Sequence, residues 1–246
     1  MKKYLSVFSL VARESIFRIA FLWIFSAIAQ AYSFFYALIY KDVQRSLNFS
    51  RAFTDSDISV DAIFTITILL TALLLIKTGT EFRTKSGYTL RRLRIDERNV
   101  FLIQSVYSTI MLFLLILFEV VLAFVLLKVG FTRFEEGRIT NQTMYLSFYE
   151  SDFLKNVFCG RDILRIVRNI LCVAALGISL SAFTFMLRRR EKFIPAILFL
   201  AAFASIFLFC PNISYLEWDI GFIISAAIMI VWSLSAVMKR GKEYDA

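Results

Sequence analysis

The sequence predicts an all-α protein integral to a membrane, and three observations lead to this fold class. Of the 246 residues, 59% are hydrophobic and 19% charged, with a mean hydropathy of +0.70, whereas soluble domains are about half apolar and a quarter charged. The apolar residues gather in six long blocks, each close to the roughly 20 residues that a helix needs to cross the hydrocarbon core. The basic residues gather between the blocks, as the positive-inside rule describes. We therefore expect one membrane domain covering 1–246.

The N-terminal region has two interpretations. Residues 1–16 mix basic and polar with apolar side chains, which is typical of an amphipathic helix lying at the membrane interface. The alternative is a frayed cytoplasmic start to the first span. That span is expected over 17–40, where tyrosines near its end indicate the headgroup region.

Five further spans follow. The second is expected over 62–78, and the third over 100–127, with a polar beginning. The fourth, fifth and sixth are expected over 169–187, 193–210 and 220–238. Residues 128–168 form the longest region outside the spans; their mixture of charged and aromatic side chains is not typical of disorder, and their fold is left open.

Charge predicts the orientation. With both termini in the cytoplasm, the cytoplasmic segments hold most of the 28 basic residues, which the positive-inside rule favours. The external region between spans 3 and 4 is the exception, because it also carries basic residues. Two of them, Arg165 and Arg168, are expected to snorkel from the outer end of span 4.

Several kinds of site are excluded. The chain has no histidine, so His-based triads, haem ligation by histidine and ordinary zinc hydrolase sites are ruled out. No GxxxxGK[ST] phosphate loop is present, so the chain does not hydrolyse ATP by a Walker mechanism. We expect no catalytic residue and no metal ligand. The net charge of +9 comes from basic residues concentrated between the apolar blocks, so it does not indicate nucleic-acid binding.

The three cysteines show no metal-binding spacing. Cys172 is expected to be a small buried apolar residue in the fourth span. Cys159 and Cys210 are both expected near the outer face, in different elements, and whether they form a disulfide is left open.

The densest block of charge lies between spans 2 and 3, in residues 79–104, GTEFRTKSGYTLRRLRIDERNVFLIQ. One interpretation is a topology signal whose basic side chains hold lipid phosphates. Lipid binding alone does not explain its glycines and acidic residues, and a protein-docking helix with Tyr88 and Leu90 or Leu93 as apolar anchors does. The residues expected at this docking surface are Gly79, Glu81, Arg83, Gly87, Tyr88, Leu90, Arg91, Arg92, Leu93, Asp96 and Glu97.

Six spans, an amphipathic N-terminus and a large basic segment after span 2 resemble the permease subunits of ABC-2-type transporters. The most specific match is KTGTEFRTKSGYTLRRLRIDERNVFLIQ, which looks like their Gly-containing turn, cytoplasmic helix and start of the third span. The resemblance implies that this helix couples to a separate cytoplasmic ATPase subunit, which would bind ATP and Mg²⁺. It also implies a second permease copy or homologous permease as partner, a place in the cell membrane, and export of a peptide or hydrophobic compound. The chain departs from the family in its long connection between spans 3 and 4 and its short turn between spans 5 and 6.

Four polar residues within the spans are candidates for a substrate path: Gln30, Gln104, Ser108 and Glu119. Three of them, Gln104, Ser108 and Glu119, fall within an arc of about 60° on one helix face, which we expect to point into a bundle. Glu119 is the only carboxylate expected deep in a span, and an intramembrane ionisable residue is a functional candidate by default. The alternative is a structural role, in which Glu119 hydrogen-bonds to a neighbouring span and fixes the bundle.

The sequence thus predicts a membrane-spanning transport subunit that binds no cofactor itself and contacts lipid. One rival is a non-transporting membrane scaffold or sensor subunit. The other is an intramembrane enzyme, which would need a nucleophile or metal cluster at membrane depth, and none is visible.

Overall fold

The computed structural model describes residues 2–40, 59–80, 97–134, 154, 162–188, 193–209 and 216–242. These ranges are helical almost throughout and contain no strand. The helices are α1 (Lys2–Tyr40), α3 (Val60–Thr80), α5 (Glu97–Phe134), α8 (Ile163–Arg188), α9 (Ile194–Phe209) and α10 (Leu216–Lys242). The predicted all-α fold class is confirmed.

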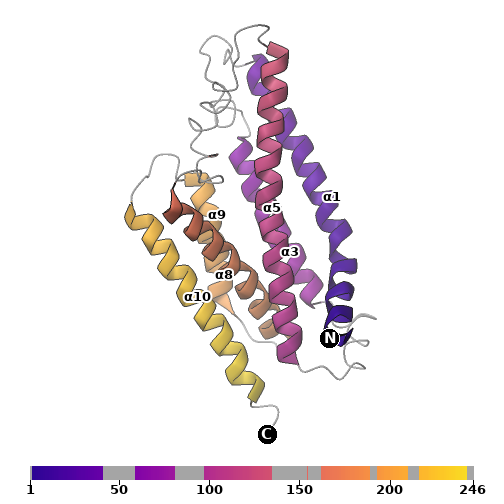
Figure 1. The fold of residues 1–246 in the computed structure, drawn as a ribbon, viewed down its shortest axis with the longest axis vertical. Coiled ribbons are helices and arrows are strands. Elements are labelled where there is room, and N and C mark those ends of the chain that lie inside the picture. The colour runs from indigo at the N-terminus through magenta and orange to yellow at the C-terminus, as the bar shows by residue number, and fades with distance from the viewer. Residues whose placement is uncertain are drawn as a thin grey trace.

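Successive helices run in opposite directions along the bundle (Figure 1). Helices α1, α5 and α9 run away from the end at which the chain begins, and α3, α8 and α10 return to it. We call this end the lower end, as in Figure 1, and the opposite one the upper end. Both chain termini lie at the lower end, and because of the alternation α3 ends and α5 begins there too.

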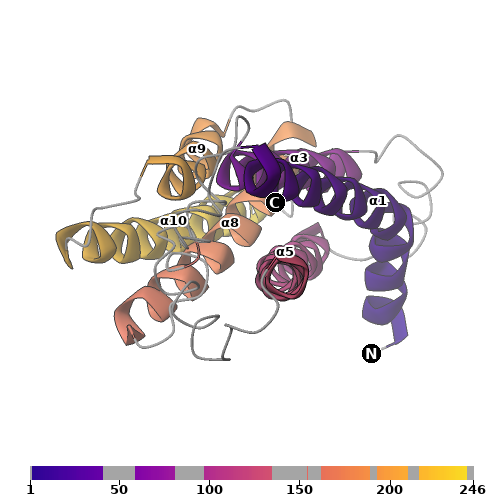
Figure 2. The same ribbon diagram turned by 90° about the horizontal axis from the view of Figure 1, so that it is seen from above.

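Helix α8 is the centre of the bundle. Seen from above, α9 and α10 lie on one side of the molecule and α1 on the other (Figure 2). Helix α8 packs against α3, α5, α9 and α10, and 67% of its apolar stretch is buried, against 22% for α10. Gly177 of α8 lets α5 approach closely, because a Cβ atom there would stand 2.7 Å from the backbone N and Cα of Thr109.

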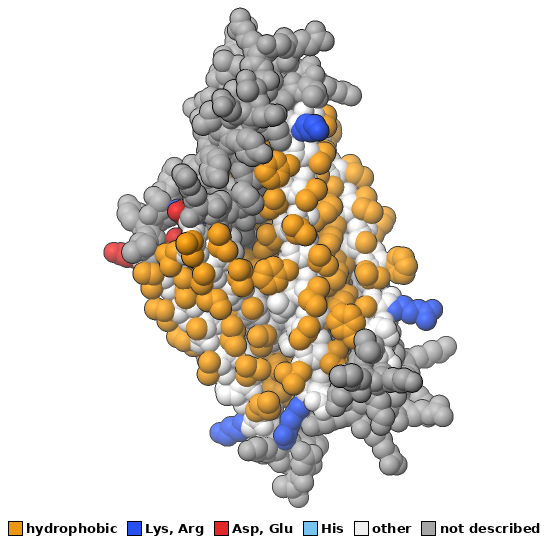
Figure 3. Space-filling view, in the orientation of Figure 1, with side chains coloured by type: hydrophobic (Ala, Val, Ile, Leu, Met, Phe, Trp, Pro, Cys, Tyr) orange, Lys and Arg blue, Asp and Glu red, His pale blue; other side chains and the backbone are white. Residues whose placement is uncertain are grey.

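Large apolar side chains cover much of the described surface (Figure 3). On α1 and α10 they recur every three or four residues and so form continuous stripes. The stripes include the exposed side chains of Phe17, Phe21, Phe25, Ile28 and Tyr32 on α1, and those of Ile224, Ile228, Val231 and Trp232 on α10. Exposed apolar area this extensive marks contact with a membrane rather than with water.

Five of the described helices are long and apolar enough to cross a membrane, namely α1, α3, α5, α8 and α10. The chain is therefore a multi-pass membrane protein. Helix α9 has a shorter apolar stretch, Ile194–Ser205, so the fifth span expected over 193–210, and with it the total of six spans, stays a prediction.

Most helices extend beyond the spans expected from the sequence. The reason is that counting apolar residues stops at the first charged side chain, whereas backbone hydrogen bonding continues through it. The clearest case is the N-terminus, where the helix expected over 1–16 is continuous with the first span, and whether it lies at the membrane interface stays a prediction. Those residues, from Lys2 onward, continue the first span as one helix, α1.

Contacts with α5 explain why this N-terminal part belongs to the bundle. The ring of Phe8 meets that of Tyr107 edge to face, with 5.6 Å between the ring centroids. The hydroxyls of Ser15 and Tyr107 share a hydrogen bond. Val7 and Ser15 are fully buried, so this stretch is packed against protein rather than frayed.

Charge is distributed unevenly between the two ends. The described helix ends at the lower end carry mainly basic side chains: Lys77, Arg98, Arg188 and Lys239, with Glu97. The upper end carries the acidic residues Asp61, Asp162, Glu217 and Asp219, with Lys128, Arg165 and Arg168. Cys159 and Cys210 lie outside the described residues, as does most of 128–168 after Phe134.

Candidate functional site

A buried polar cluster joins α1, α3 and α5. The Gln30 side-chain Nε2 of α1 donates to Oε2 of Glu119 on α5, at 3.0 Å, and to Oγ of Ser26, at 3.3 Å. The Ser26 hydroxyl in turn lies 2.7 Å from the Thr67 hydroxyl of α3. All four side chains are buried. We call Ser26, Gln30, Thr67 and Glu119 the Gln30–Glu119 cluster.

An aromatic pair lies next to this cluster. Trp23 stacks on Phe118, with ring centroids 5.7 Å apart, and its indole Nε1 donates to Thr71 Oγ1 at 3.4 Å. Residues 23, 26 and 30 follow helical spacing, so they share the face of α1 that meets α3 and α5. This face combines hydroxyl, amide, indole and carboxylate groups.

Glu119 is the electrostatically unusual member. It is only 2% exposed, and within the described ranges no basic side chain forms an ion pair with it. The hydrogen bond from Gln30 is neutral, so it supplies no compensating charge. A buried carboxylate without a counter-charge is costly, which makes this position a functional candidate.

The four residues proposed for a substrate path separate into two places. Gln104 Oε1 accepts from Arg188 Nη2 of α8 at 3.0 Å, and Ser108 accepts from Ser181 of α8 at 3.5 Å. Gln30 and Glu119 meet instead between α1 and α5. Gln104 and Glu119 lie roughly 22 Å apart along α5 at 1.5 Å per residue. The expectation that Gln104, Ser108 and Glu119 point into the bundle is confirmed by their burial. The place of all four residues in a substrate path stays a prediction.

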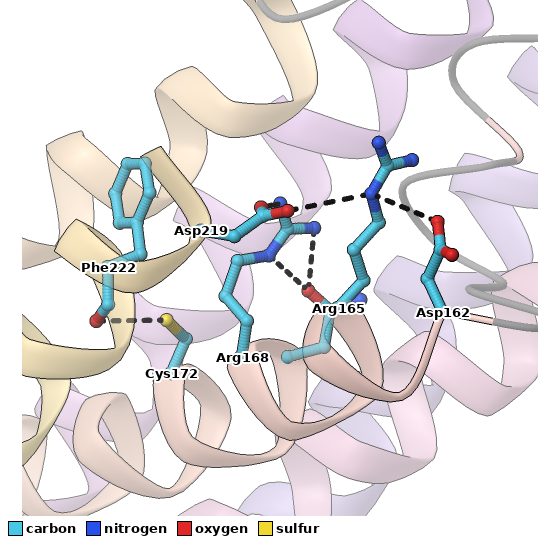
Figure 4. Close-up of polar contacts among 7 residues, drawn as sticks. Asp162, Arg165, Arg168, Cys172, Asp219 and Phe222 are labelled. Atoms are coloured by element: carbon cyan, nitrogen blue, oxygen red, sulfur yellow. Dashed lines mark hydrogen bonds and ion pairs between the residues drawn. The ribbon is translucent and has the colours of Figure 1, made fainter. Parts of the chain in front are cut away.

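A second charged cluster fastens α8 to α10 (Figure 4). Arg168 of α8 forms a buried ion pair with Asp219 of α10, and its Nε and Nη2 also donate to Asn169 Oδ1 at 3.2 and 3.1 Å. Arg165 Nε lies 3.6 Å from both Asp162 Oδ2 and Asp219 Oδ2. The expectation that Arg168 snorkels is wrong, because the side chain is bound to Asp219 inside the protein and only 5% exposed.

Sequence reasoning did not single out Asp219. The available signal was a basic residue and an acidic residue at the starts of two apolar blocks that run in the same direction, which puts them at the same depth. One turn further along, the Cys172 thiol donates to the Phe222 carbonyl, with 3.9 Å between sulfur and oxygen. Cys172 is buried, as predicted.

The helix register shows the depth of Glu119 in the bundle. Gly177 of α8 meets Thr109 of α5, and the two helices run in opposite directions. Arg168 precedes Gly177 by roughly nine residues and therefore lies near the level of Phe118 and Glu119. Figure 1 agrees, since α5 rises above the starts of α8 and α10. Glu119 thus lies towards the upper end, not at the middle of the bundle.

Little of the predicted docking surface is described. Gly79 falls within the last turn of α3 and Glu97 at the first residue of α5, where Glu97 attracts the guanidinium of Arg188 electrostatically. The other predicted residues lie outside the described part of the chain: Glu81, Arg83, Gly87, Tyr88, Leu90, Arg91, Arg92, Leu93 and Asp96.

The described residues contain no group of three or more histidine, cysteine, aspartate or glutamate side chains that could hold a metal ion. Comparisons of the chain with protein-family models, with curated proteins and with solved structures found no match.

Proposed function

We propose that this multi-pass membrane protein is the permease subunit of an ATP-driven transporter of the ABC type. In this proposal the protein exports a peptide or hydrophobic compound, works with a second permease copy or homologue in the cell membrane, and is driven by a separate ATPase subunit that binds ATP and Mg²⁺. The lower end faces the cytoplasm. The excess of basic side chains at that end supports the orientation.

The observation that carries the proposal is that α3 ends and α5 begins at the same end of the bundle, the lower end. The Tyr88 and Leu93 anchors lie in the sequence segment between these two helices. The same two helices contribute Thr67 and Glu119 to the Gln30–Glu119 cluster. A partner that pushes on the segment therefore acts directly on two of the three helices around a buried, polar part of the bundle.

The test is whether the chain retains an ATPase through this segment. The full-length protein would be affinity-purified in mild detergent from its native membrane, and ATP hydrolysis in the eluate measured per mole of chain. We expect Tyr88→Ala and Leu93→Asp to lower the retained hydrolysis by tenfold or more, because loss of a central apolar anchor costs about 2 kcal/mol or more of binding. Glu217→Gln, an exposed position at the upper end, should retain it.

Two results would contradict the proposal: absence of ATP hydrolysis with the wild-type chain, or full retention by both anchor variants at normal protein yield. The first result would favour a non-transporting scaffold. One observation already favours that second candidate, since Gln30, Gln104, Ser108 and Glu119 are all buried and hydrogen-bonded to other residues, as in a bundle held by polar contacts.

A further inference from the structure

We propose that the Gln30–Glu119 cluster is a binding site for an organic cation, a protonated amine carried on an apolar body. Glu119 would be the counter-ion and Trp23 the aromatic surface. The binding step stands on the geometry of the cluster alone. Its meaning as a substrate site rests on the proposed transport function.

The first argument is charge. The Glu119 carboxyl is buried at a helix–helix interface and receives only a neutral hydrogen bond from Gln30 among the described residues. The other acidic residue at this depth, Asp219, already has Arg168 as its partner. A positive group placed at Glu119 would supply the charge that no described residue provides there.

The second argument is the position of the Gln30 amide. Its NH₂ group lies between Glu119 Oε2 and Ser26 Oγ and donates to both. Two acceptors thus converge on one donor nitrogen, which is the arrangement that the N–H groups of an ammonium ion require. Gln30 occupies the site as a neutral substitute, and a charged donor would bind the same oxygens more strongly.

The third argument favours an organic cation over a metal ion. Metal ions such as Ca²⁺ or Mg²⁺ need six or more oxygen ligands. Here the Gln30 amide turns its donor side to Glu119, and among the described residues the cluster contains one carboxylate. Trp23 stacks on Phe118, the residue that precedes Glu119 on α5, and lies one turn before Ser26 on α1. Tryptophan is the side chain that attracts organic cations best.

The Gln30–Glu119 cluster lies close to the upper end of α3. Helix α3 begins at Val60, so Thr67 lies about two turns, or roughly 10 Å, below the start of that helix. The polar contacts that would separate to admit a ligand are the Gln30–Glu119 hydrogen bond, the Ser26–Thr67 hydroxyl pair and the Trp23–Thr71 hydrogen bond. They link α1 to α3 and α5 without an ion pair, so their separation leaves no protein charge unpaired except that of Glu119.

The experiment uses phenethylamine, an amine that is protonated at neutral pH and carries an apolar ring, and the full-length protein purified in detergent. Equilibrium dialysis with radiolabelled phenethylamine would give the dissociation constant. We expect saturable binding to the wild type, and an affinity about thirtyfold or more lower for Glu119→Gln, because one partner of a buried charge pair is removed. Glu217→Gln, which removes an exposed carboxylate, should bind like the wild type.

A second variant separates this outcome from misfolding. Gln30→Ala removes the neutral group that competes for the carboxylate and should raise the affinity, a gain that a damaged bundle cannot produce. The proposal is overturned if the wild type shows no saturable binding, if Glu119→Gln binds equally well, or if Gln30→Ala binds no more tightly. None of these measurements involves the ATPase, so they fail or succeed independently of the transport proposal.

Discussion

The ion pair between Arg168 and Asp219 makes a direct prediction about stability. Asp219→Ala leaves the Arg168 guanidinium, only 5% exposed, without its charge partner. It also removes the α10 carboxylate that lies near Arg165 of α8. Breaking a buried ion pair by deleting one partner costs about 3–5 kcal/mol. Because Asn169 Oδ1 still accepts from two nitrogens of Arg168, we expect the lower value, about 3 kcal/mol. That is a factor of about 150 in the unfolding equilibrium.

The assay is reversible unfolding of the purified full-length chain in mixed micelles of mild detergent and increasing SDS, followed by far-ultraviolet circular dichroism. The matched control is Glu217→Ala, two residues earlier on α10 and exposed. It should change the free energy of unfolding by no more than about 0.5 kcal/mol.

The reasoning would be refuted if Asp219→Ala and Glu217→Ala had the same small effect. It would also fail if the double variant Arg168→Ala/Asp219→Ala were destabilised by the full sum of the two single changes. Two residues that contact each other should show a coupling of at least about 1 kcal/mol in such a cycle.

Two further predictions concern packing. Gly177→Ala should destabilise the protein by about 1–3 kcal/mol in the same SDS titration, because its new Cβ atom would overlap the Thr109 backbone of α5. The control is Gly221→Ala, where nothing lies within 4 Å of the added Cβ atom, and it should leave the stability unchanged or raise it. Equal effects at both glycines would contradict the close approach of α5 and α8. Ser233 is fully buried on α10, and its hydroxyl has no hydrogen-bond partner in the described part of the protein. Ser233→Ala should therefore leave the free energy of unfolding unchanged or raise it by up to about 1 kcal/mol. A clear decrease in the free energy of unfolding would show that the hydroxyl has a partner.

The candidate site could be predicted only in part. Gln30 and Glu119 were recognisable because polar residues inside apolar blocks are rare and costly, and helical periodicity placed Gln104 and Ser108 towards the interior. The partner of each residue was not recognisable. Two side chains on the same face of α5 meet different helices, because the neighbours of a long helix change along its length.

The depth of Glu119 and the charge partner of Arg168 also could not be predicted from the sequence. Counting along the apolar block puts Glu119 deep in a span, whereas the register of α5 against α8, set where Gly177 meets Thr109, puts it near the level of Arg168. The reason is that α5 is longer than α3, α8 and α10. The composition of one helix does not determine how far along its neighbours it is positioned. From the sequence, Arg168 was expected to snorkel towards the headgroups. The structure shows that its partner is Asp219 of α10.

The sequence by itself determined that this chain is a helical, multi-pass membrane protein. Block length, apolar composition and the separation of charge from the blocks are local properties, and a membrane accepts few structures other than helices that satisfy their own backbone hydrogen bonds. Only the tertiary structure decided which polar groups meet. The Gln30–Glu119 contact joins residues 89 positions apart and the Arg168–Asp219 pair residues 51 apart, and such contacts depend on how the helices pack rather than on any local pattern.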